Sequence, residues 1–190
     1  LVARGLRAMN ELSELYGDHP SVYGWYMPDE TCIEGHYSEE FIRYVNQVCA
    51  EARRLNPKNK TLIAPYGTRL VIPDAKFIGQ LEQLDVDFIA YQDEIGVQKT
   101  AVEESAGFYE RLKYAHDKAG RAKLWADVEL FEFEGQVYHS ALYAAAWDRV
   151  RRQLEAVSPY VEKIFVYEYL GMMNRPGSLA EASTPGAEEL

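Results

Sequence analysis

The sequence has few cysteines and lacks the short motifs that mark common metal and nucleotide sites. Its two cysteines, Cys32 and Cys49, are too few for a disulfide framework and do not have the spacing of a zinc site. Neither H-x-H nor HExxH occurs, and both glycine-rich phosphate motifs, GxGxxG and GxxxxGK followed by Ser or Thr, are absent. No apolar run approaches the roughly 20 residues of a membrane span. The sequence therefore predicts no metal motif, no nucleotide-binding loop and no membrane span.

Positive charge is also scarce. Against 30 Asp and Glu the chain has 20 Lys and Arg, which gives a formal net charge of -10. Such a surface repels the phosphate backbone of nucleic acids and anionic membranes, so neither is an expected partner. With 190 residues, 47% hydrophobic and 26% charged, the composition fits a single globular domain over 1–190 or part of one.

Short apolar segments alternate with helical patterns along the whole chain. Strands are predicted at 22–27, 61–66, 86–91, 123–130 and 163–169. Amphipathic helices are predicted in most of the gaps, with Ser38 and Asp74 as caps of two of them and a capping box of Thr100 and Glu103 on a third. A longer loop is expected at 131–143. This alternation is typical of parallel strands joined by helical crossovers.

The predicted fold class is α/β, a (β/α)8 TIM barrel of which the chain holds only the C-terminal part, strands 4 to 8. Five strands cannot close a barrel, which needs eight units. We expect truncation at both ends, because Leu1 lies inside a helical pattern and Ser183-Thr184-Pro185 begins a new helix shortly before the chain stops. An open, doubly wound five-stranded sheet is the alternative.

Acidic residues follow four of the predicted strands. They are Asp29 and Glu30, Asp93 and Glu94, Asp127 and Glu129, and Glu168. The carboxyl ends of barrel strands form the active-site face, so these side chains are expected to meet in one acidic pocket. We interpret Glu30 and Glu129 as catalytic. Asp29 fits a loop or helix cap, and Asp127 fits an ion pair with an inward Lys or Arg from one of the missing strands. Alternation in 124–130 predicts that Asp127 and Glu129 face the barrel interior.

Aromatic side chains are frequent near the same strand ends, and rings suit the C–H faces of sugars. The predicted substrate-binding residues are Trp25, Tyr26, Asp29, Tyr66, Tyr91, Gln92, Glu94, Trp125, Asp127, His139, Tyr167 and Glu168.

Five ordered segments carry a family resemblance: 22–30 (VYGWYMPDE), 62–68 (LIAPYGT), 88–96 (FIAYQDEIG), 124–129 (LWADVE) and 165–169 (FVYEY). Together they resemble a bacterial family of glycosidase-like barrels known as domain of unknown function 4434 (DUF4434). More remotely, the pattern is similar to retaining glycoside hydrolases on TIM barrels, which implies Glu30 on strand four as acid/base and Glu129 on strand seven as nucleophile. That clan has Asn where this sequence has Asp29, and an anion there would raise the pKa of Glu30. The resemblance also implies a periplasmic or secreted location.

The function these observations favour is hydrolysis of a glycosidic bond in an oligosaccharide or polysaccharide by two carboxyls, with retention and without a cofactor. One alternative is a lyase or isomerase that binds Mg²⁺ through Asp93, Glu94, Asp127 and Glu129. A non-catalytic sugar-binding barrel is another. The sequence predicts neither the sugar, linkage and anomer nor the oligomeric state.

Overall fold

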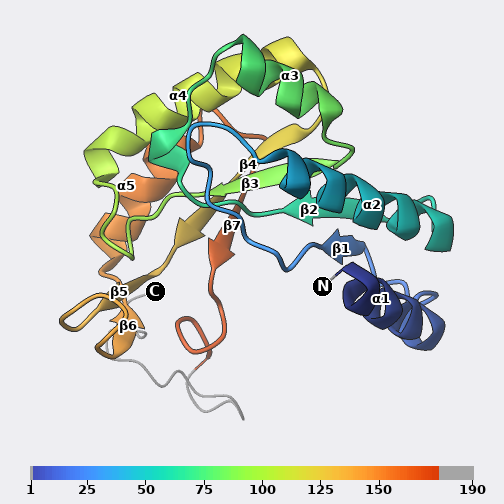
Figure 1. Ribbon diagram of the computed structural model, residues 1–190. Helices are drawn as coiled ribbons and strands as arrows, with labels where there is room; N and C mark the ends of the chain where they lie inside the picture. Colours follow the sequence, from blue (N-terminus) through green and yellow to red (C-terminus); the bar gives the residue numbers. More distant parts are fainter. Residues whose placement is uncertain (1, 176–190) are drawn as a thin grey trace.

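The computed structural model describes residues 2–175, and the chain is a curled, five-stranded parallel half-barrel covered by helices (Figure 1). The strands β1 (Gly24–Tyr26), β2 (Lys60–Ile63), β3 (Phe88–Gln92), β4 (Lys123–Glu129) and β7 (Lys163–Tyr167) lie in the order β1-β2-β3-β4-β7. All four pairings are parallel. The predicted barrel-type α/β fold is confirmed.

Helices follow the predicted alternation. They are α1 (Val2–Tyr16), α2 (Glu39–Leu55), α3 (Ala75–Gln83), α4 (Val102–Ala119) and α5 (Trp147–Val157), with a short 3-10 helix, η1 (Thr68–Leu70), after β2. The caps Ser38 and Asp74 are confirmed, because each side chain accepts a backbone N–H of its helix's first turn. The predicted capping box of Thr100 and Glu103 does not form: the N-cap of α4 is Ala101, whose side chain cannot accept a hydrogen bond, and only its backbone N–H donates to the side chain of Glu104. Leu1 and the helix predicted from Ser183 lie outside the described residues.

The segment after β4 differs from its prediction as a plain loop. It contains the antiparallel hairpin β5 (Phe131–Phe133) and β6 (Leu142–Ala144). Phe131 packs there with Ala144 and Met172 in a small hydrophobic cluster. Each strand has three residues, which is too short for its alternation to be distinguished from a loop in the sequence.

The two faces of the sheet have different cores. The outer face joins the helices in one large cluster that includes Ile63, Ile89, Ala126 and Val128. The inner face carries a small cluster in which the Phe88 and Trp125 rings stack with centroids 4.1 Å apart. Apolar packing thus fills the amino-terminal part of the interior, and polar side chains occupy the carboxyl-terminal part.

Candidate active site

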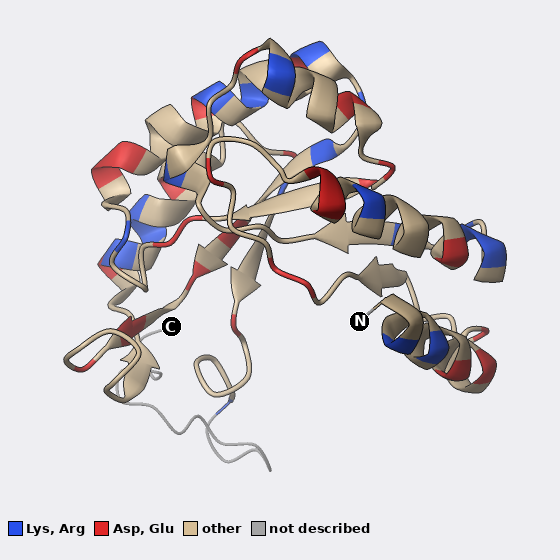
Figure 2. Ribbon diagram, in the orientation of Figure 1, with Lys and Arg blue, Asp and Glu red and all other residues tan. Residues whose placement is uncertain are grey.

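A cavity of about 210 Å³ opens at the carboxyl ends of the strands, as predicted for a barrel. The residues that line it are Glu30, Gln92, Asp127, Glu129, Phe131 and Tyr167. Figure 2 shows acidic residues at the ends of β3 and β4 and in the segment after β1, whereas Lys and Arg lie mainly on the helices. Three carboxyl groups from two separate parts of the chain therefore share one small space.

Alternation along β4 places two of these carboxyls inside the sheet. Leu124, Ala126 and Val128 pack into the helix-facing core, so the intervening Asp127 and Glu129 side chains point to the interior. The predicted orientation of this strand is confirmed. Both acids are 5% exposed, which makes their ionised forms costly.

Glu129 is held by the loop that follows β3. Its Oε2 accepts the backbone N–H of Val97 at 2.9 Å. Gly96 passes so close that a Cβ there would lie 2.9 Å from the same oxygen. Burial, and after it the charge of Asp93, raises the pKa of Glu129 to about 7. Its proton therefore exchanges in the range where enzymes use acids and bases.

Asp127 lies one layer below Glu129. Its Oδ1 is buried and has no hydrogen-bond partner within residues 2–175. Burial and the neighbouring Asp93 and Glu129 raise the pKa of Asp127 to about 8. At neutral pH the group is mainly a neutral acid, which can donate a hydrogen bond as well as accept one.

Glu30 reaches the cavity from the segment after β1. Its Oε1 accepts a 2.5 Å hydrogen bond from the hydroxyl of Tyr26, and the side chain is exposed. Burial, followed by the contact with Glu30, raises the pKa of Tyr26, so its hydroxyl remains a donor. Asp29 does not line the acidic cavity; it lines another one, near Tyr44.

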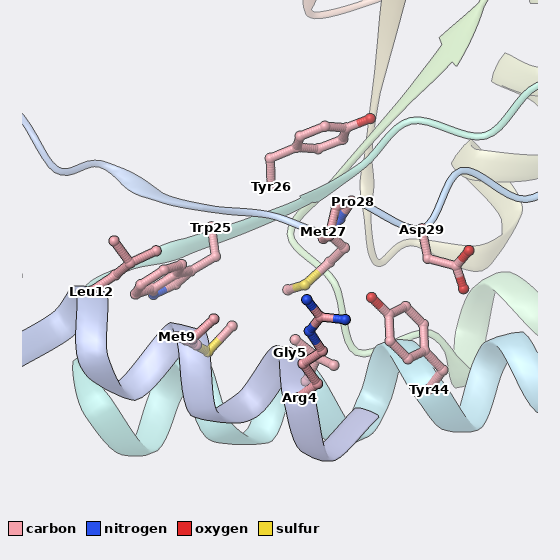
Figure 3. A pocket seen from close by; sticks show the side chains of 12 residues that line it. Arg4, Gly5, Met9, Leu12, Trp25, Tyr26, Met27, Pro28, Asp29 and Tyr44 are labelled. Atoms are coloured by element: carbon pink, nitrogen blue, oxygen red, sulfur yellow. The ribbon is translucent and has the colours of Figure 1, made fainter. Parts of the chain in front are cut away.

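That second cavity, about 540 Å³, lies between α1, β1 and α2 on the outer side of the sheet. Figure 3 shows Trp25 directed toward α1, beside Met9 and Leu12, while Tyr26 is directed away from α1. Trp25, a predicted substrate contact, therefore contributes to the helix-facing core and does not line the acidic cavity. Although this cavity is larger, its lining is mostly apolar, and the converging carboxyls are in the smaller one.

Two other aromatic residues that were predicted to contact substrate, Tyr91 and Trp125, do not line the acidic cavity either. Tyr91 is fully buried on the helix-facing side, where its hydroxyl pairs with Tyr37 and His116. Trp125 does face the interior, but it lies near the start of β4, between Phe88 and Lys163 and below the cavity. An aromatic ring contributes to a strand-end pocket only when its side chain faces the barrel interior and its residue lies near the carboxyl end of the strand.

Glu94, a predicted sugar ligand, makes structural contacts and does not line the acidic cavity. It is 1% exposed, and its Oε2 accepts the backbone N–H groups of Gly67 and Thr68 at 2.9 and 3.0 Å. Lys99 approaches Oε1 at 3.4 Å. These contacts satisfy both oxygens and fix the loop after β2 against the loop after β3.

Three more predicted contacts lie apart from the cavity lining within the described residues. Tyr66 is half-buried beneath the ammonium group of Lys99, 5.0 Å from the ring centroid. His139 is exposed near the tip of the β5–β6 hairpin, and Glu168 follows the lining residue Tyr167. Gln92 and Tyr167, in contrast, line the cavity, and their contact with substrate stays a prediction.

Sequence reasoning missed Gln153 and Arg149, and it placed Asp93 in the acidic pocket or among the metal ligands, not in a contact with the backbone of β4. All three contact the end of β4: Asp93 accepts the N–H of Glu129, and the other two donate to its carbonyl oxygen. The sequence could have indicated Gln153, because it lies on the same helical face as Val150 and Val157 and a buried amide there needs a hydrogen-bond partner.

The magnesium alternative has little support in this arrangement. Within residues 2–175, no group of three or more His, Cys, Asp or Glu side chains is arranged to hold a metal ion. Asp93 and Glu94, two of the four expected ligands, already accept N–H groups and are buried away from the cavity.

Within residues 2–175, no helix is long and apolar enough to cross a membrane.

The chain is similar in fold to two solved structures that are described as glycosidases. A candidate α-L-fucosidase from Bacteroides thetaiotaomicron VPI-5482 matches with a TM-score of 0.74 and 19% sequence identity, over 94% of this chain and 58% of that protein. A β-D-glucuronidase from Dictyoglomus thermophilum matches with a TM-score of 0.60 and 17% identity, over 88% of this chain and 28% of that one. The chain thus spans less than two thirds of either protein, and at these identities the likeness concerns the fold alone.

Among curated proteins none matches the sequence. A family model, however, matches residues 1–180, nearly the whole chain. The chain belongs to the family described as Domain of unknown function (DUF4434).

Proposed function

We propose that this domain hydrolyses glycosidic bonds in an oligosaccharide or polysaccharide, with Glu30 and Glu129 as the catalytic pair. The observation that carries the proposal is that these two carboxyls, from the ends of strands three places apart, line the same cavity. Two carboxyls on opposite sides of a sugar are what glycoside hydrolysis requires, and no cofactor is needed.

The two carboxyls take different roles. Glu30 is the acid/base that protonates the departing oxygen, since it is exposed where a leaving group would depart and is oriented by Tyr26. Glu129 is the nucleophile, held by the N–H of Val97. This assignment agrees with the order of roles along the strands that the more remote resemblance to retaining glycoside hydrolases implies.

The remaining lining residues bind the sugar. Phe131 and the half-exposed Tyr167 offer ring faces to sugar C–H groups. Gln92 offers an amide, although its Nε2 already donates to the carbonyl of Ala64 at 3.1 Å. Neutral Asp127 donates a hydrogen bond to a sugar hydroxyl, which gives its unpartnered Oδ1 a partner.

A panel of aryl glycosides tests the proposal, with EDTA present in one arm. Glu30→Gln and Glu129→Gln should each lower kcat by ~10² or more, because they remove the acid and the nucleophile. Glu132→Gln is the matched control, since Glu132 follows β4 but does not line the cavity. Sugar binding without turnover would instead identify a binding domain, and loss of turnover on chelation would identify a metal enzyme.

Stereochemistry provides a second test. Direct attack by Glu129 requires the two carboxyls to lie about 5–5.5 Å apart and retains the anomeric configuration, whereas inversion requires roughly 6.5–9.5 Å. Proton NMR of the first product formed distinguishes the two outcomes. A product of inverted configuration would contradict the role of Glu129 as nucleophile.

A further inference from the structure

The carboxylate of Asp93 takes the place of a backbone carbonyl at the end of the sheet. The regular β3–β4 pairing ends at Gln92 and Asp127, and the N–H of Asp93 still donates to Asp127 O at 2.9 Å. At the next position the N–H of Glu129 donates to Asp93 Oδ1 at 3.2 Å. The backbone of Glu129 is therefore held by a side chain where β3 has already turned away.

Helix α5 holds the other side of the same peptide. Gln153 Nε2 donates both to Asp93 Oδ2 at 2.6 Å and to Glu129 O at 3.2 Å. One turn earlier, Arg149 donates to Glu129 O at 3.3 Å and to Phe131 O at 2.7 Å. The backbone N–H of Glu129 is thus held by Asp93, and its carbonyl oxygen is held by Gln153 and Arg149.

Core packing alone does not explain these residues. Asp93 is 1% exposed and Gln153 is fully buried, and burial of a carboxylate or an amide is costly. Gln153 also leaves its Oε1 without a hydrogen-bond partner among the described residues. Apolar side chains would fill the same space without these costs, so the network has a geometric purpose.

We propose that Asp93 and Gln153 are positioning residues, which hold the backbone of Glu129 and so fix its carboxyl in the cavity, and that the same contact places the charge of Asp93 next to Glu129. The inference rests on the proposed function, because it gives Glu129 its catalytic orientation. Displacement of a reacting group by about 1 Å can cost roughly 10²-fold in rate, so such support has a measurable effect.

Several other ionisable groups face Glu129 and must stay unchanged in the test. They are Glu94 from the loop after β3, Asp127 from β4, Glu30 from the segment after β1, Tyr167 from β7, Tyr109 from α4 and Arg149 from α5. Asp93 is the largest charge contribution to the raised pKa of Glu129, so its neutralisation should make Glu129 a stronger acid.

The geometric part is tested with Gln153→Met in the protein, which removes the amide and keeps the length of the side chain. We expect kcat to fall by at least ~10-fold with KM changed less than about two-fold. Gln80→Met is the matched control, because Gln80 is a buried glutamine that pairs with the backbone of Tyr37, away from the cavity. The proposal is supported if the two variants lose similar thermal stability but only Gln153→Met loses kcat. If Gln153→Met and Gln80→Met have the same kcat, the proposal is overturned.

The electrostatic part is tested with Asp93→Asn. Asparagine keeps an oxygen for the N–H of Glu129, and Gln153 can turn its amide so that its unpartnered Oε1 accepts from the new NH₂ group. That turn gives up the donation from Gln153 to Glu129 O, to which Arg149 still donates. The measurement is ¹³C NMR titration of labelled glutamate carboxyls, with Glu129→Gln to assign the signal. The Glu129 midpoint should move to lower pH by about one unit or more.

This titration needs no turnover, so it separates the two proposals. If the wild-type protein hydrolyses no glycoside but the Glu129 midpoint still moves in Asp93→Asn, the proposed function fails and the control of ionisation by Asp93 stands. An unmoved midpoint would overturn that control even in an active enzyme.

Discussion

The hydroxyl of Tyr26 donates a 2.5 Å hydrogen bond to Glu30, across a turn that contains Pro28. Pro28 cannot donate to a neighbouring strand, so the backbone leaves the sheet there. Tyr26, the last residue of β1, faces the interior and connects the exposed Glu30 to the rigid sheet. The candidate acid/base is thus positioned by one side chain, in contrast to Glu129, which several groups hold.

Removal of that hydroxyl tests the dependence of Glu30 on Tyr26. Tyr26→Phe should lower kcat on an aryl glycoside by about 10-fold or more, since a hydrogen bond to a charged group contributes roughly 1.5–3 kcal/mol. Stability should change little, because Tyr26 is 44% exposed. Tyr114→Phe, on the surface of α4, serves as the control. An unchanged kcat would show that Glu30 does not need this contact.

Gly96 leaves space for the Glu129 carboxyl, and Ala there should remove that space. Its Cβ would lie 2.6 Å from Phe131 O and 2.9 Å from Glu129 Oε2, closer than real Cβ contacts allow. Steady-state kinetics of Gly96→Ala should show kcat reduced by roughly 10–100-fold. Gly107→Ala, where nothing lies within 4 Å of the added Cβ, should keep kcat and gain about 0.5–1 kcal/mol of stability within its helix. Full activity in Gly96→Ala would place the nucleophile elsewhere.

The rate should depend on the ionisation of Glu129. A nucleophile must be a carboxylate, and burial raises the pKa of Glu129 to about 7. We therefore expect kcat/KM to increase with pH and to reach half its maximum near pH 7. Measurement from pH 5 to 9 with a substrate of good leaving group isolates this step, because such a group needs little protonation. A rate that is flat across this range would contradict the role given to Glu129.

Alternation along β4 predicted its inward face because helix-facing Leu124, Ala126 and Val128 differ clearly from Asp127 and Glu129. In β3, alternation does not distinguish the inward face from the helix-facing one. The strand reads Phe-Ile-Ala-Tyr-Gln, which is apolar on both faces, as is common for parallel strands buried on both sides. Tyr91 was therefore interpreted as a pocket residue although it packs under α4.

The hydrogen-bond network around Glu129 could not be predicted from the sequence for a different reason. Asp93 follows β3 directly, and the pattern that predicts a polar strand end does not say which N–H the carboxylate accepts. Its partner Gln153 lies 60 residues later, on the helix that packs beside the end of β4. Contacts between such distant residues follow from the curvature of the sheet, which the strand pattern alone does not specify.

Asp127 makes the stability of the protein depend on pH. Its pKa is raised to about 8 in the folded state, mainly by burial, against about 3.9 in an unfolded chain. Below pH 4 the carboxyl is protonated in both states, so its burial has no pH-dependent cost. Between pH 4 and 8 the unfolded chain binds fewer protons than the folded one, so stability falls as pH rises, and the full cost is present above pH 8.

Asp127→Asn replaces this acid with a neutral group of nearly the same shape and should remove most of that dependence. Urea unfolding at pH 5 and pH 9 measures it: the variant should gain more stability over the wild type at pH 9 than at pH 5, by about 2–4 kcal/mol. Asp117→Asn, on the exposed surface of α4, is the control and should show nearly equal differences at the two pH values. Asp127→Asn should keep its activity while it loses the pH dependence of stability. The amide still donates a hydrogen bond to a sugar hydroxyl but, unlike a carboxyl, does not titrate. If the gain in stability is the same at both pH values, Asp127 is ionised in the folded protein, and its contact with substrate must be that of an acceptor.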